Sequence, residues 1–471
     1  MTDITSRAPQ DAALVSAVRE AVEARFPTTL QTLTDLVAIP GIAWDSADRT
    51  QLERSAEAVA GLLREAGLQE VEIVTETRDD GRPGGPAVIG EKPGASDKPT
   101  VLLYAHHDVQ PIGDEDLWDT PPLVATERGG RLYGRGAADD KAGIMAHVAA
   151  LRAHAGDLPV GVTVFVEGEE EVGSDSLATV LERHGDRLDA DVIVLADAMN
   201  WEVGTPALTT TLRGLVRADI TVSTLDHGVH SGMFGGPLPD ALTALCRLLA
   251  TLHDAAGDVA VAGLDHAEAA DLDYDEARLR AESGALEGTA LIGSGSILSR
   301  LWTRPALSVI GLDAPAVEAA SNTLVPSARA RVSMRLAPTQ DPGRAFEALR
   351  EHLLSRAPWG ASVEVTLSDE GPGFAAATDG AAHDEARAAF ADAWGAAPVE
   401  IGCGGSIPFV AAFAERFPEA AILVTGVEDP DTRAHGANES LHLGEFERVC
   451  VAEALLLARL GRLPTGPRGS D

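Results

Sequence analysis

Apolar residues fall into two kinds of pattern along the first half of the chain. Residues 52–66 repeat Leu, Ala and Val at three- and four-residue steps, which predicts a helix with one buried face, and Gly67 follows as its stop signal. Continuous apolar runs of strand length then appear, of the kind found in strands that are buried on both faces. These runs lie at residues 71–74, 101–104, 160–166 and 192–195, with a helical stretch at 142–155 between two of them. The pattern predicts an α/β domain with a mostly parallel sheet flanked by helices.

From about residue 214 apolar and polar residues alternate one by one. The alternation is clear at 216–222 and returns at 328–336 and 363–367, so each of these segments has one apolar face and one solvent-exposed polar face. Leucines at helical spacing occupy 242–252 between them. This pattern predicts an α+β domain in which an antiparallel sheet carries helices on one face.

A fully apolar strand returns at residues 421–424, after the alternating segments have ended. The second domain is therefore predicted to be inserted into the first rather than appended to it. We expect a catalytic domain built from residues 1–213 and 377–471, and an inserted lid and dimerisation domain at 214–376.

Composition narrows the classes of partner. The 471 residues include 37 Lys and Arg against 73 Asp and Glu, so the formal charge is −36. Such a charge repels nucleic acid and anionic membranes, and neither is expected as a partner. Its simplest explanation is a solvated surface. The three cysteines have no CxxC spacing, and no leader or run of 18 apolar residues is present, so a cytoplasmic location is expected.

Histidines and acidic residues follow several of the predicted strands. His106-His107-Asp108, Glu169-Glu170-Glu171 and Asp197 each come shortly after a buried strand, while Asp139-Asp140 and His435 lie in loops. Ligands of open α/β sheets gather beyond the carboxyl ends of the strands, and imidazole with carboxylate suits divalent cations. Taken singly, each residue is more often a helix cap or part of a solvated turn. Their co-location predicts a hydrolytic two-metal site.

Three stretches carry a family resemblance: residues 104–111 (YAHHDVQP), 132–141 (LYGRGAADDK) and 167–174 (EGEEEVGS). They resemble the signatures of the di-zinc metallopeptidase family that includes carboxypeptidase G, aminoacylase and the carnosinase-type dipeptidases. Asp197, residues 404–408 and His435 continue the match in order, from about residue 30 to 455. The Asp-Val-Gln-Pro sequence and the length of the insertion resemble the cytosolic dipeptidase branch.

The resemblance implies two divalent metal ions, zinc by preference with manganese or cobalt as alternatives. It places His106 and Asp197 on one metal and Glu171 and His435 on the other, with Asp139 bridging them. In an extended strand His106 and Asp108 face the same way, so Asp108 can orient His106. His107 points opposite and is expected to be structural, although the sequence alone leaves an exchange of the two histidines open.

Glu170 is the predicted general base, which takes a proton from a metal-bound water. Glu169 stays a rival, because only the family's Glu-Glu-x-Gly register decides between adjacent glutamates. The resemblance implies that His230, on the inserted domain, stabilises the oxyanion in the active site of the opposite subunit of a homodimer. His227 competes with it, and the sequence does not decide whether His230 acts within its own subunit.

Substrate recognition is predicted on the resemblance at Thr323, Arg335, Gly405 and Ser406. Arg335 would clamp a free carboxylate, although an arginine on a polar strand face is usually only solvated. Ala105 and Gly402-Cys403 depart from the family pattern, and the latter lies beside the expected substrate pocket. Cys403 has no assigned base and is interpreted as a packed thiol.

The sequence thus predicts a dinuclear metallopeptidase that hydrolyses dipeptides or short peptides after its lid closes. An aspartate at position 197 accompanies dipeptidase and aminopeptidase activity in the family. One alternative keeps the metal site but makes the protein an N-acyl-amino-acid deacylase. A third hypothesis, a catalytically idle metal-binding or scaffold protein, is disfavoured because the base and all five ligand positions are present.

Overall fold

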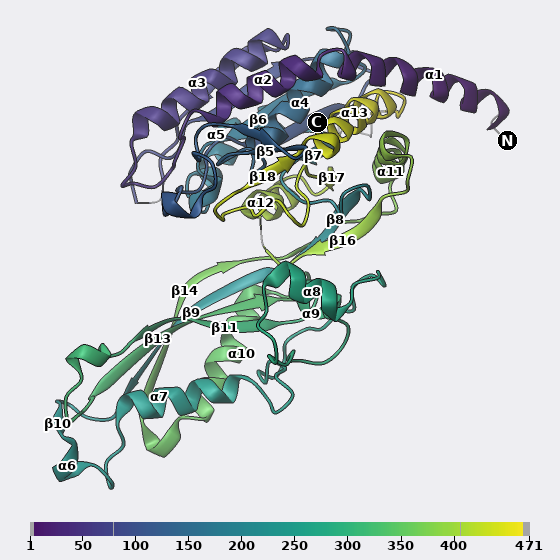
Figure 1. Cartoon of the computed structure of the whole chain (residues 1–471). Coiled ribbons are helices and arrows are strands. Elements are labelled where there is room, and N and C mark those ends of the chain that lie inside the picture. The colour runs from purple at the N-terminus through teal and green to yellow at the C-terminus, as the bar shows by residue number, and fades with distance from the viewer. Residues whose placement is uncertain (1–3, 79, 406, 465–471) are drawn as a thin grey trace. The chain divides into compact units, whose positions relative to one another are not determined.

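The protein forms two compact units in a computed structural model that describes residues 4–78, 80–405 and 407–464. Unit 1 runs to Thr210 and continues over Ala376–Ile401 and from Pro408 onward. Unit 2 comprises Thr211–Ala375 and the short segment Gly402–Ile407. Each unit has its own sheet and its own hydrophobic core (Figure 1).

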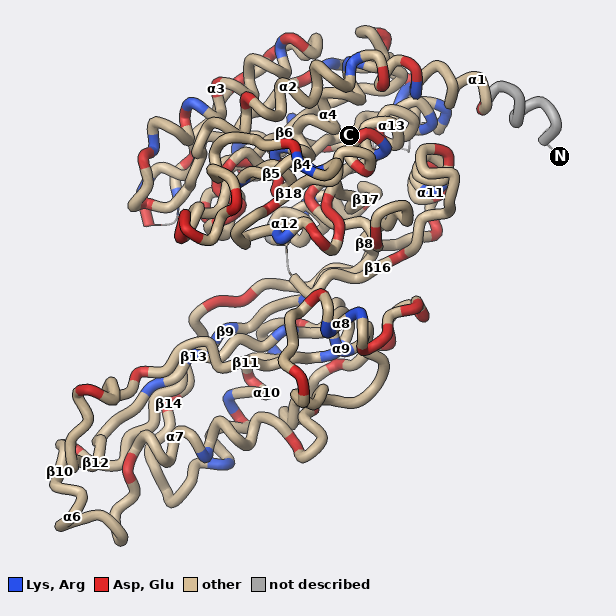
Figure 2. Tube along the Cα trace, viewed as in Figure 1, with Lys and Arg blue, Asp and Glu red and all other residues tan. Residues whose placement is uncertain are grey.

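Charge is dispersed rather than concentrated in one block. Figure 2 shows Asp and Glu along the chain of both units, with Lys and Arg interspersed among them. A solvated surface therefore explains most of the net charge of −36. Within the described residues, no helix is both long and apolar enough to cross a membrane.

A mixed sheet forms the middle layer of unit 1. Its strands lie in the order β1 (Gln69–Val74), β2 (Ala87–Lys92), β6 (Gly161–Glu167), β3 (Thr100–His106), β7 (Val192–Leu195), β17 (Ala421–Val424) and β8 (Ala207–Leu212). The short strands β15 (Phe374–Ala375) and β16 (Val399–Cys403) pair with β8.

The four central strands β6, β3, β7 and β17 are parallel, and the flanking strands run antiparallel. The α/β prediction is confirmed, with a mixed sheet whose parallel part is its centre. The apolar run at residues 71–74 was expected in the buried part of the sheet, but β1 is an antiparallel edge strand that is half exposed. Its partner β2 was not predicted.

Helices cover both faces of this sheet. The helices that share the larger core are α1 (Ile4–Glu23), α2 (Phe26–Val37), α3 (Arg49–Glu65), α4 (Lys141–Ala153), α11 (Ala381–Trp394) and α13 (Leu443–Leu460). On the other face lie α5 (Leu177–Leu188) and α12 (Pro408–Arg416). The boundaries of α3 agree with the sequence, since the Asp48 side chain caps its start and Gly67 follows its end with a φ of +92°.

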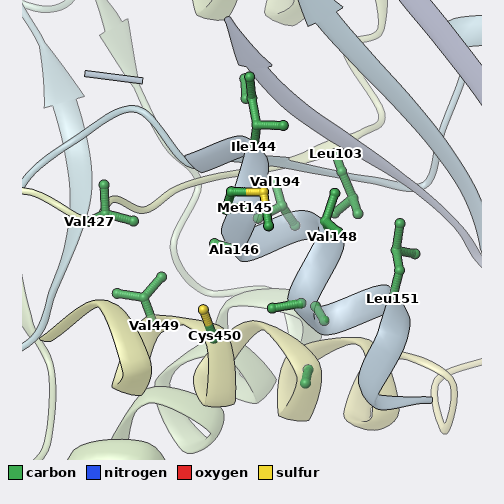
Figure 3. Close-up of a cluster of buried hydrophobic side chains, with 14 of the residues drawn as sticks. Leu103, Ile144, Met145, Ala146, Val148, Leu151, Val194, Val427, Val449 and Cys450 are labelled. Carbon is green, nitrogen blue, oxygen red and sulfur yellow. The ribbon is translucent and has the colours of Figure 1, made fainter. Parts of the chain in front are cut away.

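Strand β3 is clamped from both faces. Figure 3 shows Leu103 and Val194 of the sheet packed with α4, which in turn lies on Cys450 of α13. On the opposite face the ring of Tyr104 stacks on Phe409 of α12, with 3.6 Å between their centroids. Because β3 ends at His106, this packing fixes the position of that histidine.

Short strands and 3-10 turns complete unit 1. A three-stranded sheet joins β18 (Ser440–His442), β5 (Arg131–Tyr133) and β4 (Thr126–Arg128). Two 3-10 turns are η1 (Glu115–Leu117) and η2 (Glu170–Val172). The pairing of β18 with β5 brings residues just before 440 next to residues just after 133.

Unit 2 is built on an antiparallel sheet, as its alternation predicts. The strand order is β11 (Ala306–Asp313), β13 (Ser327–Leu336), β9 (Gly214–Ser223) and β14 (Ser362–Gly371). One face packs on α7 (Ala241–Leu249) and α10 (Pro342–Ser355). Leu367 departs from the predicted pattern and is exposed, because the register of β14 shifts just after it.

Shorter elements occupy the rest of unit 2. The strands β10 (Val229–His230) and β12 (Thr323–Leu324) pair with each other, and α6 (Ser231–Phe234) follows β10 directly. The remaining elements are α8 (Glu276–Ser283), α9 (Ile297–Trp302), η3 (Ala250–Leu252), η4 (Val317–Ala319) and η5 (Pro358–Gly360).

Candidate metal centre

The polar clusters lie where the central parallel strands end. His106 is the last residue of β3, Glu170 and Glu171 follow β6 in η2, and Asp197 comes two residues after β7. These strands are neighbours and run in the same direction. Their carboxyl ends therefore place these side chains at a single edge of the sheet.

Asp139 lies between two histidines. Its Oδ1 is 3.1 Å from His106 Nε2, and its Oδ2 is 3.2 Å from His435 Nε2. The same His435 nitrogen is 3.2 Å from Glu171 Oε2, while Asp197 Oδ1 lies 3.8 Å from His106 Nε2. The five predicted metal ligands are thus brought together in unit 1, with one oxygen of Asp139 facing each half of the cluster.

The side chains form two groups that could each hold a cation. Asp139, Glu171 and His435 offer ligand atoms within 4.8 Å of one another, and so do His106, Asp140 and Asp197. Asp140 had no role in the site that the sequence predicts. Its Oδ2 accepts the backbone N–H of His106, so this carboxylate also helps to hold the end of β3.

Asp108 connects the two ligand loops. Its Oδ1 is 3.4 Å from His106 Nδ1, on the side of the ring that faces away from Asp139. The two carboxylate oxygens also accept the backbone N–H groups of Glu170 and Glu171, at 3.2 and 3.1 Å. The backbone carbonyl oxygen of Asp108 lies nearer to the same ring nitrogen, at 3.1 Å, so residue 108 contacts His106 through both groups while its carboxylate also holds the acidic turn.

The three adjacent glutamates have different surroundings. The carboxylate of Glu169 is buried and accepts hydrogen bonds from Arg78, from the backbone of Gly85, and from both the backbone and the hydroxyl of Ser176. It is therefore committed to structure. Among the described residues, no side-chain hydrogen bond engages Glu170. This contrast favours Glu170 over Glu169 as the base.

His107 does not join the cluster. Its Nε2 contacts the carbonyl oxygen of Pro86 at 2.7 Å, and burial lowers the pKa of the ring. Among the described residues its Nδ1 has no hydrogen-bond partner. The position favours the structural interpretation of His107 and the metal-ligand interpretation of His106.

Gathering these groups perturbs their proton affinities. Burial and the negative charge of Glu171 raise the pKa of Glu170 to about 7, although His106 opposes the shift. Burial and Asp140 raise the pKa of Asp197. Hydrogen bonds to Asp139 and Glu171 raise the pKa of His435 to about 10. Without cations, protons are thus retained between the ligands, and metal binding would displace them.

The residues fit a pair of divalent cations. Among the described residues, the buried oxygens Glu171 Oε1 and Asp140 Oδ1 have no hydrogen-bond partner, which is costly in the absence of another charge. Two imidazoles combined with carboxylates suit zinc, manganese and cobalt alike.

Comparison with known proteins identifies the family. The family model described as "Peptidase family M20/M25/M40" matches residues 102–459. The chain belongs to this family. The resemblance drawn from the motifs is confirmed, and the protein is a hydrolase of the peptidase class.

Named relatives cover almost the whole chain. A cysteinylglycine-S-conjugate dipeptidase of Corynebacterium striatum is 36% identical over 417 residues, which span 87% of this chain and 90% of the relative. A Cys-Gly metallodipeptidase, dug1, of Schizosaccharomyces pombe is 27% identical and covers 91% and 94% of the two chains. The crystal structure of human carnosine dipeptidase 1 superposes with a TM-score of 0.80 at 27% identity, over 96% of this chain and 99% of that one.

The other predicted residues lie in unit 2. His230 and Thr323 are partners in the β10–β12 ladder, so these two are brought together. His230 Nδ1 accepts the backbone N–H of Gly232 at 3.0 Å, which leaves the proton of the neutral ring on Nε2. The rival His227 is paired with Asp226. This arrangement favours His230 as a hydrogen-bond donor.

Arg335 lies at the far end of the same unit from His230. Along β13, Arg329 and Arg331 donate to Asp219, whereas Arg335 is near the end of the strand and close to Arg213. Burial, together with the charge of Arg335, lowers the pKa of Arg213 to about 10. The backbone N–H of Gly405 donates to Cys403 Sγ, and Ser406 lies outside the described residues.

Sequence reasoning missed several residues that support the site. Gln110 donates to Glu171 Oε2, and Arg213 donates to the carbonyl oxygens of Gly404 and Arg300. Gln110 was part of a recognised motif but had no assigned role. Glu439 comes four residues after His435, and only its contacts in the folded chain reveal what it does.

Proposed function

We propose that the protein is a dinuclear metallopeptidase that cleaves dipeptides or short peptides. The observation that carries the proposal is the position of Asp139, whose two oxygens face His106 and His435. A carboxylate so placed can bridge two cations. His106 and Asp197 would complete one site, and Glu171 and His435 the other.

The two cations would supply Lewis acidity and would lower the pKa of a water molecule in the site. We assign zinc as the preferred metal, with manganese or cobalt as alternatives. Glu170 acts as general base, because its carboxylate is close enough to interact electrostatically with His106 and Glu171, and no side chain of the described residues forms a hydrogen bond with it. It accepts the proton of the attacking water and passes it to the leaving amine.

Small peptides with a free carboxylate are the proposed substrates. The relatives are named for dipeptides such as Cys-Gly, and the human neighbour is named a carnosine dipeptidase. Arg335 would bind the substrate carboxylate through its guanidinium, with Gly405 and Ser406 adding donors. The charge of the neighbouring Arg213 would strengthen that attraction.

The arrangement of unit 2 supports a homodimer in which His230 and Thr323 serve the partner's active site. Eight residue steps along β13 separate residue 327 from Arg335, which is about 26 Å at 3.3 Å per residue. His230 pairs with Thr323, four residues before β13 begins, and Figure 1 shows its strand β10 at the end of unit 2 that lies beyond β13. A dipeptide spans only about 7 Å. One substrate therefore cannot reach both residues of the same lid.

Exposed apolar groups in unit 2 fit the same proposal. Met233, three residues after His230, is 75% exposed, and Phe234 and Leu238 are also exposed. Strand β11 forms an edge of the sheet and exposes Val309 and Ile310. An edge strand with exposed apolar residues favours pairing with another chain.

A cytoplasmic location is proposed from the state of the cysteines. No disulfide links Cys246, Cys403 or Cys450, which fits a reducing compartment.

A substrate panel with defined metal content tests the function. Protein reconstituted with zinc, manganese or cobalt should hydrolyse dipeptides such as Cys-Gly faster than N-acyl amino acids. The reverse preference would make it a deacylase, and inactivity with both classes would contradict the proposal.

Glu170→Ala tests the base. The variant should bind two metal ions per chain yet lose turnover, because the ligand set is intact and only the proton acceptor is gone. Glu182→Gln, an exposed change on α5, serves as the control and should keep full activity. Turnover retained by Glu170→Ala would refute the assignment.

A further inference from the structure

We propose that Glu439, together with Arg135, is a positioning residue that holds the bridging carboxylate of Asp139 and so sets the affinity of both metal positions at once. The inference rests on the proposed two-metal function. Among the described residues, the Glu439 side chain forms no hydrogen bond with a ligand side chain, and it acts through the backbone of the loop that carries Asp139.

The carboxylate of Glu439 is wrapped by that loop. Its Oε1 accepts the backbone N–H groups of Ala138 and Asp139, at 3.0 and 3.2 Å. Its Oε2 accepts the backbone N–H of Gly136 at 3.1 Å and Nη1 of Arg135 at 2.6 Å. Four donors from one loop segment, at positions 135, 136, 138 and 139, therefore converge on this one side chain.

Arg135 extends the network to the other ligand loops. Its Nη2 donates to the carbonyl oxygen of Gly436, next to His435, and to that of Pro111 in the segment after His106. The side chains of Glu439 and Arg135 are 0% and 2% exposed. A buried ion pair of this kind is strongly disrupted when one partner is removed, because the other is left uncompensated.

The backbone contacts reinforce the same connection. The carbonyl oxygen of Glu439 accepts the N–H of Gly134 at 3.1 Å, and Ser440 pairs with Tyr133 at the start of β18. The segment from His435 to Ser440 is thereby tied to the segment from Tyr133 to Asp139. Both segments carry a predicted ligand, so their separation determines how Asp139 faces His435.

Asp139 is shared by both cation positions, and this sharing gives the proposal a distinctive consequence. Loss of a ligand that serves one cation, such as Glu171, should weaken the binding of that cation more than the binding of the other. Displacement of Asp139 should weaken the binding of both cations together. Partners that orient a metal ligand typically change metal affinity by about 10–100-fold when they are mutated.

Glu439→Gln is the decisive variant. The amide keeps one acceptor oxygen but places an NH₂ group against two of the loop donors, so Asp139 loses its anchor while the side-chain volume is retained. We expect both zinc dissociation constants, measured by competition with a chromophoric chelator, to rise about 10–100-fold. At saturating zinc, kcat should recover and the KM for a dipeptide should stay within about twofold.

Glu445→Gln is the matched control. Glu445 is a fully buried carboxylate on α13 that accepts hydrogen bonds from Trp394 and Arg448, and within the described part of the chain none of its hydrogen bonds reaches the ligand loops. This variant should lower the melting temperature without changing the zinc affinity. The comparison separates a general loss of stability from a specific loss of positioning.

The outcomes divide cleanly. Wild-type zinc affinities in Glu439→Gln, or weakening of only one of the two sites, would overturn the proposal. If Glu439→Gln does not fold, Arg135→Lys decides in the same assay, because lysine keeps the charge but not the fork that reaches Gly436 and Pro111. Failure of the wild-type protein to bind two metals would instead refute the proposed function.

Discussion

Asp108→Asn is the substitution that tests the geometry of the metal centre most directly. Asp108 presents two oxygens to the Glu170-Glu171 turn and one of them also to the ring of His106. Asparagine has the same shape but keeps only one acceptor oxygen. In either orientation its NH₂ group faces a backbone N–H of the turn, and in one of them it also faces the ring nitrogen of His106, whose 3.1 Å contact with the backbone carbonyl oxygen of residue 108 is kept.

The expected magnitude follows from that mismatch. Loss of one hydrogen bond to a charged acceptor costs about 1.5–3 kcal/mol. At 1.4 kcal/mol per tenfold change, this is about 10- to 100-fold in an equilibrium constant. The turn stays near its place because Glu169 anchors it independently through Arg78 and Ser176. The loss should therefore appear mainly in metal affinity and kcat rather than in folding.

Chelator competition and steady-state kinetics at saturating metal measure the two effects. Asp191→Asn is the control, because Asp191 accepts the N–H of Thr100 at the opposite end of the same strand, β3. The control should keep its metal affinity. If Asp108→Asn binds zinc and turns over like the wild type, or if Asp191→Asn weakens zinc equally, the positioning role of Asp108 is wrong.

Three further predictions concern pH, dimerisation and loop packing. Burial raises the pKa of Glu167 from 4.5 to about 8. The native state therefore holds a proton that the unfolded state releases between about pH 4.5 and 8, and the stability of the metal-free protein should fall with rising pH by up to about 1.4 kcal/mol per unit. Urea denaturation should show this decline reduced in Glu167→Gln, and parallel curves for the two proteins would contradict it. Mixing His230→Ala with Glu170→Ala subunits should restore roughly a quarter of the wild-type activity, because half of the dimers have one intact site; no recovery in verified mixed dimers would place His230 in its own subunit's site. Finally, Gly426→Ala puts a Cβ 1.5 Å from the carbonyl oxygen of Ala198, so it should lower both the melting temperature and metal affinity, and a fully stable variant would contradict the packing of these loops.

The central strands and their ends could be predicted from the sequence because both depend on local signals. Continuous apolar runs mark strands that are buried on both faces, and in a parallel arrangement their ends must share an edge. That reasoning predicts from the sequence alone that His106, Glu171 and Asp197 lie together. It failed at β1, since an apolar run does not reveal whether the strand lies in the centre or at the edge.

The roles within the site depend on contacts between distant segments, which the sequence does not encode locally. Glu169 and Glu170 are adjacent and chemically identical, and they differ because Arg78 and Ser176 surround only the first. Asp140 likewise had no role assigned from the sequence, because only the folded chain brings its carboxylate to the backbone N–H of His106. Glu439 has no periodic signal, and it is 300 positions away from the Asp139 N–H that it accepts.

The cost of concentrating carboxylates explains why so much of unit 1 serves to hold loops. Asp139, Asp140, Asp197 and Glu171 repel one another, and burial raises the penalty for each ionised group. Backbone N–H donors and arginine compensate the supporting carboxylates of Asp108, Glu169 and Glu439, but Glu171 Oε1 and Asp140 Oδ1 receive no such compensation among the described residues. Cations bound from solution are the remaining source of compensating positive charge. Metal binding and folding should therefore be linked, with a gain in stability of RT ln(1 + [M]/Kd) for each site.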